Sequence, residues 1–499
     1  MENYRTMEKN RTSERVNNSS NPGDCKEIDE TNKINFENAE DSDKSIKSIQ
    51  RSTIFVVIIT SFITTFTGSA LNLSIPSMGN EFHASATAVG WIVTGYILAA
   101  AVLSVPFGRL ADRTGRKRVL VTGILIFAFC SGGAALAESM TMLLLFRVLQ
   151  GVGAAMIFST NMAVLISAFS PEKRGKVLGY SIASTYIGLS AGPVVGGFLN
   201  HYFGWRSIFI LTFVISGVVC YTAMRKLPAG KVDHEKPGLD LVGNILYILM
   251  LTLIMFGLST VSTLVYSKYL ILAGIILFAI FIIHELRAKS PIIEVRLFAH
   301  NIGYAFSNLA ALMNYGATFA LSYLLSIYLQ VVMDYSSEVS GLILISQPLM
   351  MALLSPYAGR LSDRVSPFKL ASFGMGLCAL GLFSFIFISE NYPFPLIIAN
   401  LLVVGVGFAF FSSPNTNAVM ACVEKKDYSV ASSILATMRT IGHSASMAVV
   451  TFIVAHRMGD ITLGDAEPAL LVDTMQISFL IFTCVCGAGI FISLKRKRR

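Results

Sequence analysis

The sequence predicts an all-α polytopic membrane protein, made of two six-helix bundles with two extra transmembrane helices between them. Three observations predict this class. The 499 residues are 54% hydrophobic and only 14% charged, a balance that soluble domains do not reach. Apolar stretches of about 20 residues, enough to cross a bilayer core of roughly 30 Å, recur along the chain. A short charged motif occurs twice, once in each half.

The first 50 residues differ in kind from the rest. They are rich in Asn, Ser, Glu, Asp and Lys and poor in aliphatic residues, a composition typical of a disordered tail. The first apolar stretch begins near Thr53 and is too long for a cleaved signal peptide. We therefore expect residues 1–50 to be a disordered cytoplasmic tail that precedes a retained first helix.

Fourteen apolar stretches follow, and each is predicted to be a transmembrane helix. Six form an N-terminal bundle within residues 51–226, two cross a linker at 227–302, and six form a C-terminal bundle at 303–494. A basic cytoplasmic end, 495–499, closes the chain. The predicted spans are 53–76, 88–108, 119–137, 141–165, 175–199, 206–225, 239–259, 267–286, 303–331, 339–358, 368–389, 394–418, 429–455 and 474–494.

Basic residues test this count. Nearly all Lys and Arg after the tail fall on one side of the predicted spans, and only Arg206, Lys268 and Arg457 fall on the other. By the positive-inside rule the basic side is cytoplasmic. An even number of spans then places both termini in the cytoplasm, and we expect a multi-pass protein of the cell membrane. The net charge of +9 is explained by this topology, so nucleic acid is not expected as a partner.

The repeated charged motif relates the two halves. Arg109, Leu110, Asp112 and Arg113 recur as Arg360, Leu361, Asp363 and Arg364. Each copy ends the second span of its six-span block. Two parallel six-span halves of this kind are typical of secondary transporters.

Four segments resemble signatures of the major facilitator superfamily, in its fourteen-span drug:proton antiporter branch. The resemblance runs from about residue 53 to 455. The segments are Gly108–Lys117, similar to the loop 2–3 motif; Arg147–Gly153, similar to the span 4 motif; Gly188–Gly197, similar to the span 5 antiporter motif; and Tyr328–Gln330 with Gly359–Arg364, similar to the start of the second half.

This resemblance implies roles for particular residues. In the loop 2–3 motif and its second copy it implies a gate, which comprises Gly108, Arg109, Asp112, Arg113, Gly115, Arg116, Asp363 and Arg364. We expect Asp112 to pair with an arginine of its own loop or with a helix N-terminus of the other bundle. In span 5, small residues and a proline predict either a helix that packs tightly and pivots between access states or ordinary small-residue packing; the residues are Gly188, Gly192, Pro193, Gly196 and Gly197.

One position departs from the branch. Its members usually carry an aspartate in span 1, ahead of an Asn-x-x-x-Pro segment. Here that segment is Asn72–Pro76, and Thr67 occupies the position of the aspartate. The proton carrier is therefore open: Glu138, Asp334, Arg147, His443 and the substrate itself are the candidates.

Deep ionisable residues in the spans are cationic. Arg147 lies near the start of span 4 and either faces the cavity or snorkels to the interface. Arg439 and His443 share one helix face in span 13. An unpaired arginine in a membrane is expensive, so Arg439 should face water, a partner or a substrate, or be a hydrogen-bonded structural cation. His443 is either a packing residue or a proton carrier, since an ordinary histidine titrates near pH 6.5.

Polar residues within the spans are candidates for a substrate cavity, although each alone is more often a helix–helix hydrogen bond. The candidates, with Arg439, are Thr64, Thr67, Asn72, Tyr96, Asn161, Tyr186, Asn314, Tyr315, Tyr323, Gln347, Asn415 and Asn417.

These features predict a transporter that works by alternating access. The chain has no phosphate-binding loop, nucleophile–base set or metal-ligand spacing, so neither an ATP-driven pump, an enzyme nor a cofactor is expected. The expected partners are a small-molecule substrate, protons and the lipid bilayer, and the chain is expected to be a monomer. Proton-coupled efflux of a neutral or anionic amphiphile is favoured. An importer or uniporter, or a non-transporting membrane sensor, remains open.

Overall fold

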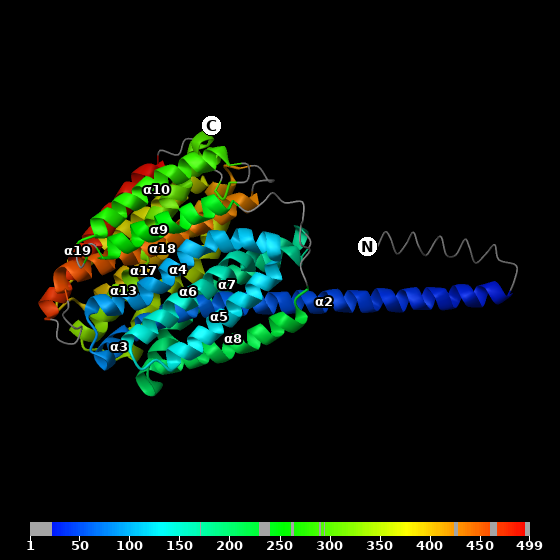
Figure 1. Cartoon of the computed structure of the whole chain (residues 1–499), viewed down its shortest axis with the longest axis horizontal. Helices are drawn as coiled ribbons and strands as arrows, with labels where there is room; N and C mark the ends of the chain where they lie inside the picture. The colour runs from blue at the N-terminus through cyan, green and yellow to red at the C-terminus, as the bar shows by residue number, and fades with distance from the viewer. Residues whose placement is uncertain are drawn as a thin grey trace.

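The computed structural model describes residues 22–169, 171–228, 240–260, 264–288, 291–293, 295–423, 428–459 and 467–494. It describes side chains from Lys47 onward, with gaps inside α7, α11, α15 and α18. The described chain is built of helices that run side by side through one body (Figure 1).

The N-terminal half supplies six long helices and one short one. α2, α4, α6, α7 and α8 pack around one another, with α5 against α6 and α8. Short α3 is held to the start of α8 at Glu81, whose carboxylate accepts from Trp205 Nε1 at 2.6 Å and pairs with Arg206 at 2.7 Å. The bounds are α2 Pro22–Asn72, α3 Ile75–Phe82, α4 Ala86–Thr114, α5 Arg116–Ala135, α6 Met140–Ser167, α7 Pro171–Phe203 and α8 Arg206–Lys226.

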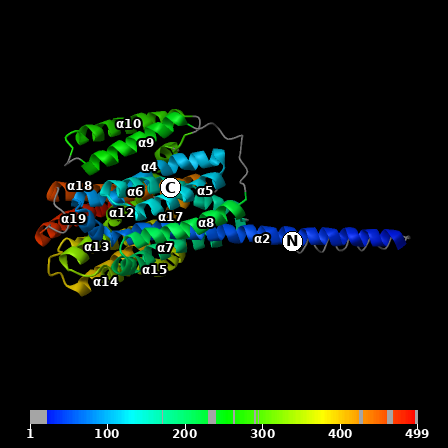
Figure 2. The same cartoon turned by 60° about the horizontal axis from the view of Figure 1, so that its bottom comes forward.

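Two helices form a separate pair along one flank of the body (Figure 2). They are α9, Leu241–Thr260, and α10, Ser267–Arg287. α9 packs on α4 of the first half and on α18 of the second. α10 carries many exposed apolar side chains, as expected of a helix that faces lipid. Short α11, Val295–His300, leads from this pair into the second half.

The C-terminal half forms the second bundle. α16 and α17 pack closely, α15 packs on α17, and α12 packs on α17, α18 and α19. The bounds are α12 Ile302–Thr318, α13 Leu321–Ile327, the π-helix η1 Tyr328–Val332, α14 Ser337–Leu344, α15 Ser346–Arg364, α16 Pro367–Phe385, α17 Phe394–Met420, α18 Tyr428–Met458 and α19 Pro468–Leu494.

Thirteen of the described helical segments are long and apolar enough to cross a membrane. Five of them belong to the N-terminal bundle, two are the flank helices and six belong to the C-terminal bundle. The all-helical, multi-pass prediction is therefore confirmed. α7, which corresponds to the predicted span 175–199, is not among the thirteen. The count of fourteen therefore stays a prediction.

Three predicted spans are interrupted. The first breaks at Leu73–Ser74, because Pro76 near the start of α3 cannot continue the hydrogen bonding of α2. The predicted span 303–331 breaks before Leu321, where the hydroxyl of Ser446 on α18 accepts the backbone amide of Ala320 at 3.1 Å. The predicted span 339–358 breaks at Ile345 between α14 and α15.

The structure differs from the sequence expectation over the tail. It continues α2 back to Pro22 as a helix that projects from the body (Figure 1), where the sequence predicts disorder up to residue 50. Residues 24–50 contain neither Gly nor Pro, and Glu and Lys favour helix. Residues 1–21 lie outside the described residues.

The two ends of the body differ in charge. We call the end with Arg109–Arg118 the basic end, and the end with the loops after α5 and η1 the opposite end. At the opposite end, Ser85, Ser139 and Ser336 cap α4, α6 and α14 by accepting a backbone amide three residues on. At the basic end, Gly115 joins α4 to α5 with φ 105°, a backbone conformation that only glycine adopts readily.

Candidate functional site

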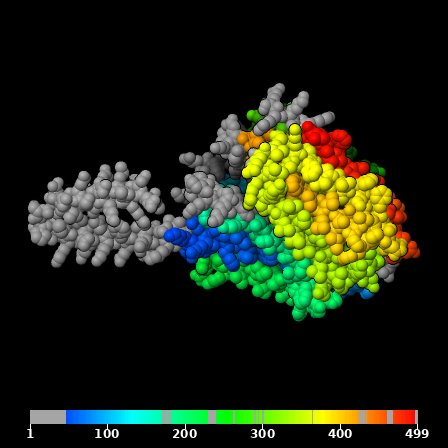
Figure 3. All heavy atoms as spheres, turned by 180° about the vertical axis from the view of Figure 1, so that it is seen from behind, coloured from blue at the N-terminus to red at the C-terminus, as the bar shows by residue number. Residues whose placement is uncertain are grey.

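The two bundles meet at the opposite end through small residues. On α7, Gly197 faces the backbone carbonyl of Ser337, whose hydroxyl donates to the Gly197 carbonyl at 3.2 Å. One turn earlier, the carbonyl of Pro193 lies against Gly341 on α14. A side chain at either glycine would collide with backbone of the other bundle, so the seam closes only because Cβ atoms are missing there. Figure 3 shows α7 beside α14 and α15 on one face of the body.

A second seam joins α4 to α18 near the same end. Thr94 and Thr451 share a hydrogen bond of 2.9 Å between their hydroxyls. Thr87 donates to the carbonyl of Gly459 at 3.2 Å. Gly90 faces both Thr451 and the hydroxyl of Tyr323. These contacts close the opposite end on its second side.

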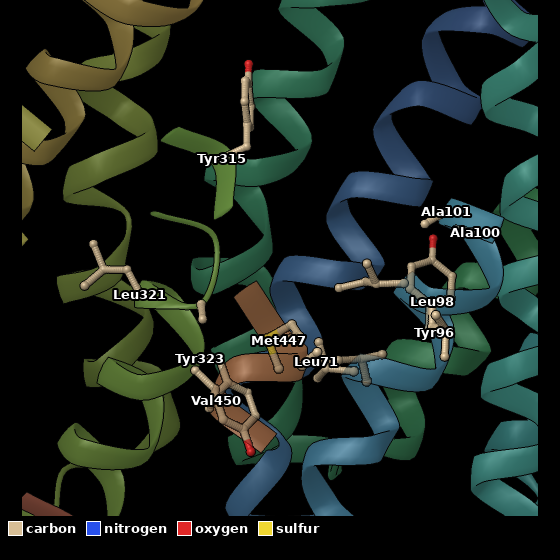
Figure 4. Packing of buried hydrophobic residues seen from close by; sticks show 14 of the residues in the cluster. Leu71, Tyr96, Leu98, Ala100, Ala101, Tyr315, Leu321, Tyr323, Met447 and Val450 are labelled. Atoms are coloured by element: carbon tan, nitrogen blue, oxygen red, sulfur yellow. The ribbon is translucent and has the colours of Figure 1, made fainter. Parts of the chain in front are cut away.

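A third contact closes this end between the seams. The hydroxyl of Ser326 on α13 donates to the carbonyl of Asn72, the last residue of α2, at 2.5 Å. Figure 4 shows Leu71 of α2 beside Met447 and Val450 of α18, with Tyr323 next to them. The structure thus brings two predicted cavity residues, Asn72 and Tyr323, to the interface between the bundles.

The other face of α7 packs inside its own bundle. Gly188, Gly192 and Gly196, four residues apart, all face α2. A Cβ at Gly192 would lie 2.5 Å from that of Ser69, and one at Gly196 would lie 2.5 Å from that of Ala70. The antiporter-motif residues therefore serve two surfaces: three glycines hold α7 to α2, while Pro193 and Gly197 meet the other bundle.

The carboxylate of the charged motif at the basic end is paired within its own loop. Arg116 donates from Nε and Nη2 to Asp112 Oδ1 at 3.0 and 2.9 Å. Both side chains are more than one-third exposed. Arg113 is exposed, as is Arg364 of the second copy. Gly108 has room for a Cβ, 3.6 Å from Ser159. The predicted pairing of Asp112 with an arginine of its loop is what the structure contains; the side chain of Asp363 lies outside the described residues.

A polar and aromatic cluster spans the middle of the bundle interface. The guanidinium of Arg439 donates from Nη2 to Thr416 Oγ1 on α17 at 2.6 Å, and it lies 5.3 Å from the ring centre of Tyr315 on α12. The hydroxyl of Tyr315 shares a 2.9 Å hydrogen bond with Ser412. Ser412 in turn lies 3.3 Å from the hydroxyl of Tyr186 on α7. Three helices of the C-terminal bundle and one of the N-terminal bundle thus converge here, and we call this set the Arg439 cluster.

An aromatic wall adjoins the cluster. The ring of His443 stacks on Phe319 at 4.2 Å between centroids and meets Tyr315 edge-on at 5.3 Å. Arg439 is partly buried, and its Nε is a buried donor with no hydrogen-bond partner within the described part of the chain. A planar ligand could stack on these aromatic rings and accept a hydrogen bond from this unpaired buried donor.

Arg147 has a different environment. It is 1% exposed and lies inside the N-terminal bundle. Its Nε donates to the carbonyl of Ile92 at 3.1 Å, Nη1 donates to Gln150, and the guanidinium stacks 4.2 Å from the ring centre of Tyr96. Gln150 continues the chain to Ser131 at 2.7 Å. Arg147 is therefore a hydrogen-bonded cation that links α4, α5 and α6 within the N-terminal bundle, and it does not snorkel to a surface.

Several predicted cavity residues lie within a bundle. The hydroxyl of Thr67 lies 3.1 Å from that of Thr212, between α2 and α8. Asn161 accepts from Thr60 at 3.0 Å, between α6 and α2. Tyr96 is covered by Arg147, as described above. These contacts are helix–helix hydrogen bonds, and they give no support to a shared cavity in the N-terminal bundle.

The same holds in the C-terminal bundle. Asn415 donates to the carbonyl of Ser307 at 3.2 Å, and Asn314 is fully buried near Cys486. Gln347 is 7% exposed on α15, with its backbone against Gly405.

The two acidic proton-carrier candidates are at the surface. Glu138 lies exposed in the loop between α5 and α6. Asp334 lies exposed in the loop before α14, with φ 54°. Neither lies in the Arg439 cluster; of the proposed carrier residues, His443 is the one that contacts it, at Tyr315.

Three residues of the cluster and its aromatic wall escape the sequence prediction: Ser412, Thr416 and Phe319. A signal for two of them exists, because Ser412, Asn415 and Thr416 are spaced three and four apart and so share one face of α17. Phe319 lies at a helix break, where helical periodicity does not predict which way a side chain points.

Comparison with known proteins agrees with this geometry. The chain is 27% identical to the riboflavin transporter RibZ of Clostridioides difficile over 439 residues, 88% of this chain and 96% of that protein. It is 26% identical to the methylenomycin A resistance protein of Bacillus subtilis, covering 82% and 90% of the two chains. It is 27% identical to the multidrug resistance protein Stp of Mycobacterium tuberculosis, covering 77% and 72%.

Solved structures share the fold. A bacterial homologue of the human lysosomal transporter Spinster, in an inward-facing and unoccupied conformation, superposes with a TM-score of 0.65 at 15% identity over 90% of this chain and 99% of that one. The peptide transporter POT in complex with sulfate gives the same TM-score over 89% and 93%. The family model of the Major Facilitator Superfamily matches residues 57–447 and 307–499. With two helical bundles around a polar cluster, the chain belongs to the major facilitator superfamily and is a membrane transporter.

Proposed function

We propose that this protein is a proton-coupled secondary transporter that exports neutral or anionic, amphiphilic small molecules by alternating access. The Arg439 cluster carries the proposal. It lies where the bundles meet, combines a cation with aromatic rings, and includes Tyr186 from the other bundle. A site of this kind can change its access when the bundles rock.

The basic end is assigned to the cytoplasm by the positive-inside rule. Described hydrogen bonds between the bundles run from Tyr186–Ser412 to the opposite end, at Thr94–Thr451, Ser326–Asn72 and Ser337–Gly197. The motif at the basic end instead pairs Asp112 with Arg116 of the same loop. This distribution supports an inward-facing state, closed outside by the two seams.

The charge of the site sets the substrate class. No salt bridge joins Arg439 to a carboxylate within the described part of the chain. Like charges repel strongly at low dielectric, so a hydrophobic cation is disfavoured beside this guanidinium. A planar ligand with a carboxylate or carbonyl could stack on Tyr315 and accept from Arg439 Nε.

The names of the relatives bear on the direction of transport and on the substrate class. Two are named for resistance to methylenomycin A or to multiple drugs, which supports export. One is named a riboflavin transporter, and riboflavin is planar and uncharged. We include the fourteen-span drug:proton branch in the proposal, with α7 as the additional span: it is a 33-residue helix that carries the antiporter motif.

Proton coupling would pass through His443 or through the substrate. Of the titratable candidates, only His443 contacts the cluster, at Tyr315 and Phe319. Arg147 is held by three partners inside its bundle and serves there as a structural cation in this proposal.

A flux assay in proteoliposomes tests the function. Carboxyfluorescein, riboflavin and ethidium represent an anionic, a neutral and a cationic planar solute, and each is measured with and without a pH gradient. We expect gradient-driven transport of the first two and little of ethidium. Transport of ethidium alone would overturn the substrate class, and transport that ignores the gradient would indicate a uniporter.

The direction of transport and the sensor alternative need separate readouts. Vesicles of known orientation distinguish export from import. Ligand binding without flux, in vesicles that hold folded protein, would identify a non-transporting sensor.

A further inference from the structure

The flank pair α9–α10 is joined to the N-terminal bundle along α4. Trp91 packs on Phe256 with ring centres 5.5 Å apart. The hydroxyl of Tyr247 lies 3.4 Å from the carbonyl of Ala101. Both contacts link α9 to α4. α9 also packs along α18 of the other bundle, more extensively than along α4, so the ties that attach the pair to one bundle must come from specific bonds.

A short connection after α10 is held from two sides at the basic end. Arg109 Nη2, on α4, donates to the carbonyls of Pro291 at 2.5 Å and Ile292 at 2.9 Å. Glu285 Oε2, on α10, accepts the amide of Ile293 at 2.9 Å. Ile292 and Ile293 are buried, and buried backbone groups need such partners. We call these bonds the clamp.

The clamp has a rigid base. Glu285 is 3% exposed. A Cβ on Gly243 would lie 2.8 Å from Glu285 Oε1 and 2.6 Å from Asp240 Oδ2. Asp240 also accepts the amide of Gly243 at 2.8 Å and contacts His284 at 2.8 Å. The ends of α9 and α10 are thus fixed to each other where the clamp begins.

The other end of the connection belongs to the second bundle. Asn301 Nδ2 donates to the carbonyl of Cys422, just after α17, at 2.5 Å, and its Oδ1 accepts the amide of Tyr304 at 2.9 Å. α11 lies between this anchor and the clamp. The connection between the bundles is therefore bonded to α4 and α10 at one end and to α17 at the other.

The internal repeat provides a comparison. Arg360 matches Arg109 in the second copy of the motif, but Arg360 is exposed whereas Arg109 is partly buried. The matched position supplies a control with the same charge and helix setting.

We propose that Arg109 and Glu285 are positioning residues that keep the α9–α10 pair fixed to the N-terminal bundle while the two bundles rock. α18 then slides past α9, and the movement is taken up between the clamp and Asn301. This goes beyond the proposed function: it requires rocking bundles, but neither the substrate nor the direction of transport.

Distances between spin labels test the clamp. Labels replace three exposed basic-end residues: Arg118 on α5, Arg287 on α10 and Lys369 on α16. The seven native cysteines are first replaced in a background that keeps its melting temperature. A second background carries Gly341→Leu, which forces the opposite end apart. We expect the 118–369 distance to shorten there and the 118–287 distance to stay narrow and unchanged.

Variants that remove the clamp should loosen the attachment of α10 to the N-terminal bundle. Arg109→Ala and Glu285→Ala should widen the 118–287 distribution about two-fold, because few local bonds then resist opening of the connection. Glu285→Gln keeps an acceptor and should stay narrow, as should Arg360→Ala. A purely structural role would lower the melting temperature without this widening.

Two results would overturn the proposal. One is that, with the clamp residues intact, Gly341→Leu changes the 118–287 distance together with the 118–369 distance. The other is that both alanine variants leave the 118–287 distribution unchanged. Flux is measured in parallel. Absent flux with the expected distances rejects the proposed function and leaves the clamp standing.

Discussion

The two ends of the bundle interface are built from different chemistry. At the opposite end, Gly197 and Gly341 let backbones of the two bundles touch, and hydroxyl pairs such as Thr94–Thr451 complete the seal. At the basic end, Asp112 and Arg116 form an ion pair within one loop, and both side chains are more than one-third exposed. A seal of touching backbones fits only one arrangement of the two bundles, so it is either closed or fully open. Exposed ion pairs can exchange partners at little cost, so the opposite end suits an all-or-none seal and the basic end a gate that re-forms.

The largest effect should follow from breaking the seal. Gly341→Val places a side chain against the carbonyl of Pro193, and overpacking of this kind costs roughly 1–3 kcal/mol. A cost of that size shifts a two-state population about 5- to 150-fold. We expect transport to fall by a factor in that range, and a maleimide to label a cysteine at Thr87 from outside faster than in the unaltered chain.

A glycine in open space serves as the control. Gly376 on α16 has no atom within 4 Å of a built Cβ, so Gly376→Val should leave transport and labelling nearly unchanged. Equal losses in the two variants would show that helix propensity, and not the seal, explains the effect.

The Arg439 cluster lies between the two ends and should respond in substrate recognition. Arg439→Gln removes the cation, and hydrogen bonds to charged groups contribute about 1.5–3 kcal/mol. We expect carboxyfluorescein flux to fall about 10- to 100-fold on that basis, with a smaller loss for Arg439→Lys, which keeps the charge but loses the planar fork. The measurement is the initial rate against substrate concentration. A loss of equal size for ethidium would contradict a role in charge selection.

Much of the fold could be predicted from sequence, because hydropathy and charge depend on each helix alone. The break before Leu321 could not be predicted, because it depends on Ser446, a residue of a distant helix whose hydroxyl accepts a backbone amide. The tail from Pro22 to residue 50 was expected to be disordered by composition, yet helix propensity over the same residues favours the helix that the structure contains.

The site was predictable only in part. The depth of Arg439 and His443 in an apolar span identifies them, since ionisable residues there are costly. Their partners, Thr416 and Phe319, depend on how α17 and α12 are rotated about their axes, which one sequence does not determine. Arg147 satisfied the same depth criterion but is bonded within its bundle.

The gate motif should separate stability from transport. The Asp112–Arg116 pair is more than one-third exposed on both sides, and such pairs contribute at most about 1 kcal/mol. Asp112→Asn should therefore change the melting temperature by only a few degrees or less, because the ion pair contributes so little to the free energy of unfolding. We still expect transport to fall about ten-fold, because the carboxylate is needed when the basic end closes on the other bundle. Thermal unfolding and flux on the same preparation check this, and normal flux would remove Asp112 from the gate.

The smallest effect is expected at Thr67, which lies at neither end. Its hydroxyl donates to the carbonyl of Ile63 at 2.7 Å and lies 3.1 Å from Thr212, in a fully buried position within the N-terminal bundle. Thr67→Val keeps the shape and removes one hydrogen bond, which contributes about 0.5–1.5 kcal/mol. We expect slightly lower thermal stability, unchanged flux, and unchanged labelling at both ends. Thr67→Asp, in contrast, buries a carboxylate beside the Ile63 carbonyl, with the Thr212 hydroxyl as a donor, and it should destabilise the bundle strongly. If Thr67→Asp instead folded and gained proton-driven flux, the position would be a coupling site that this chain leaves unused, and Thr212 would be its neighbour in the coupling.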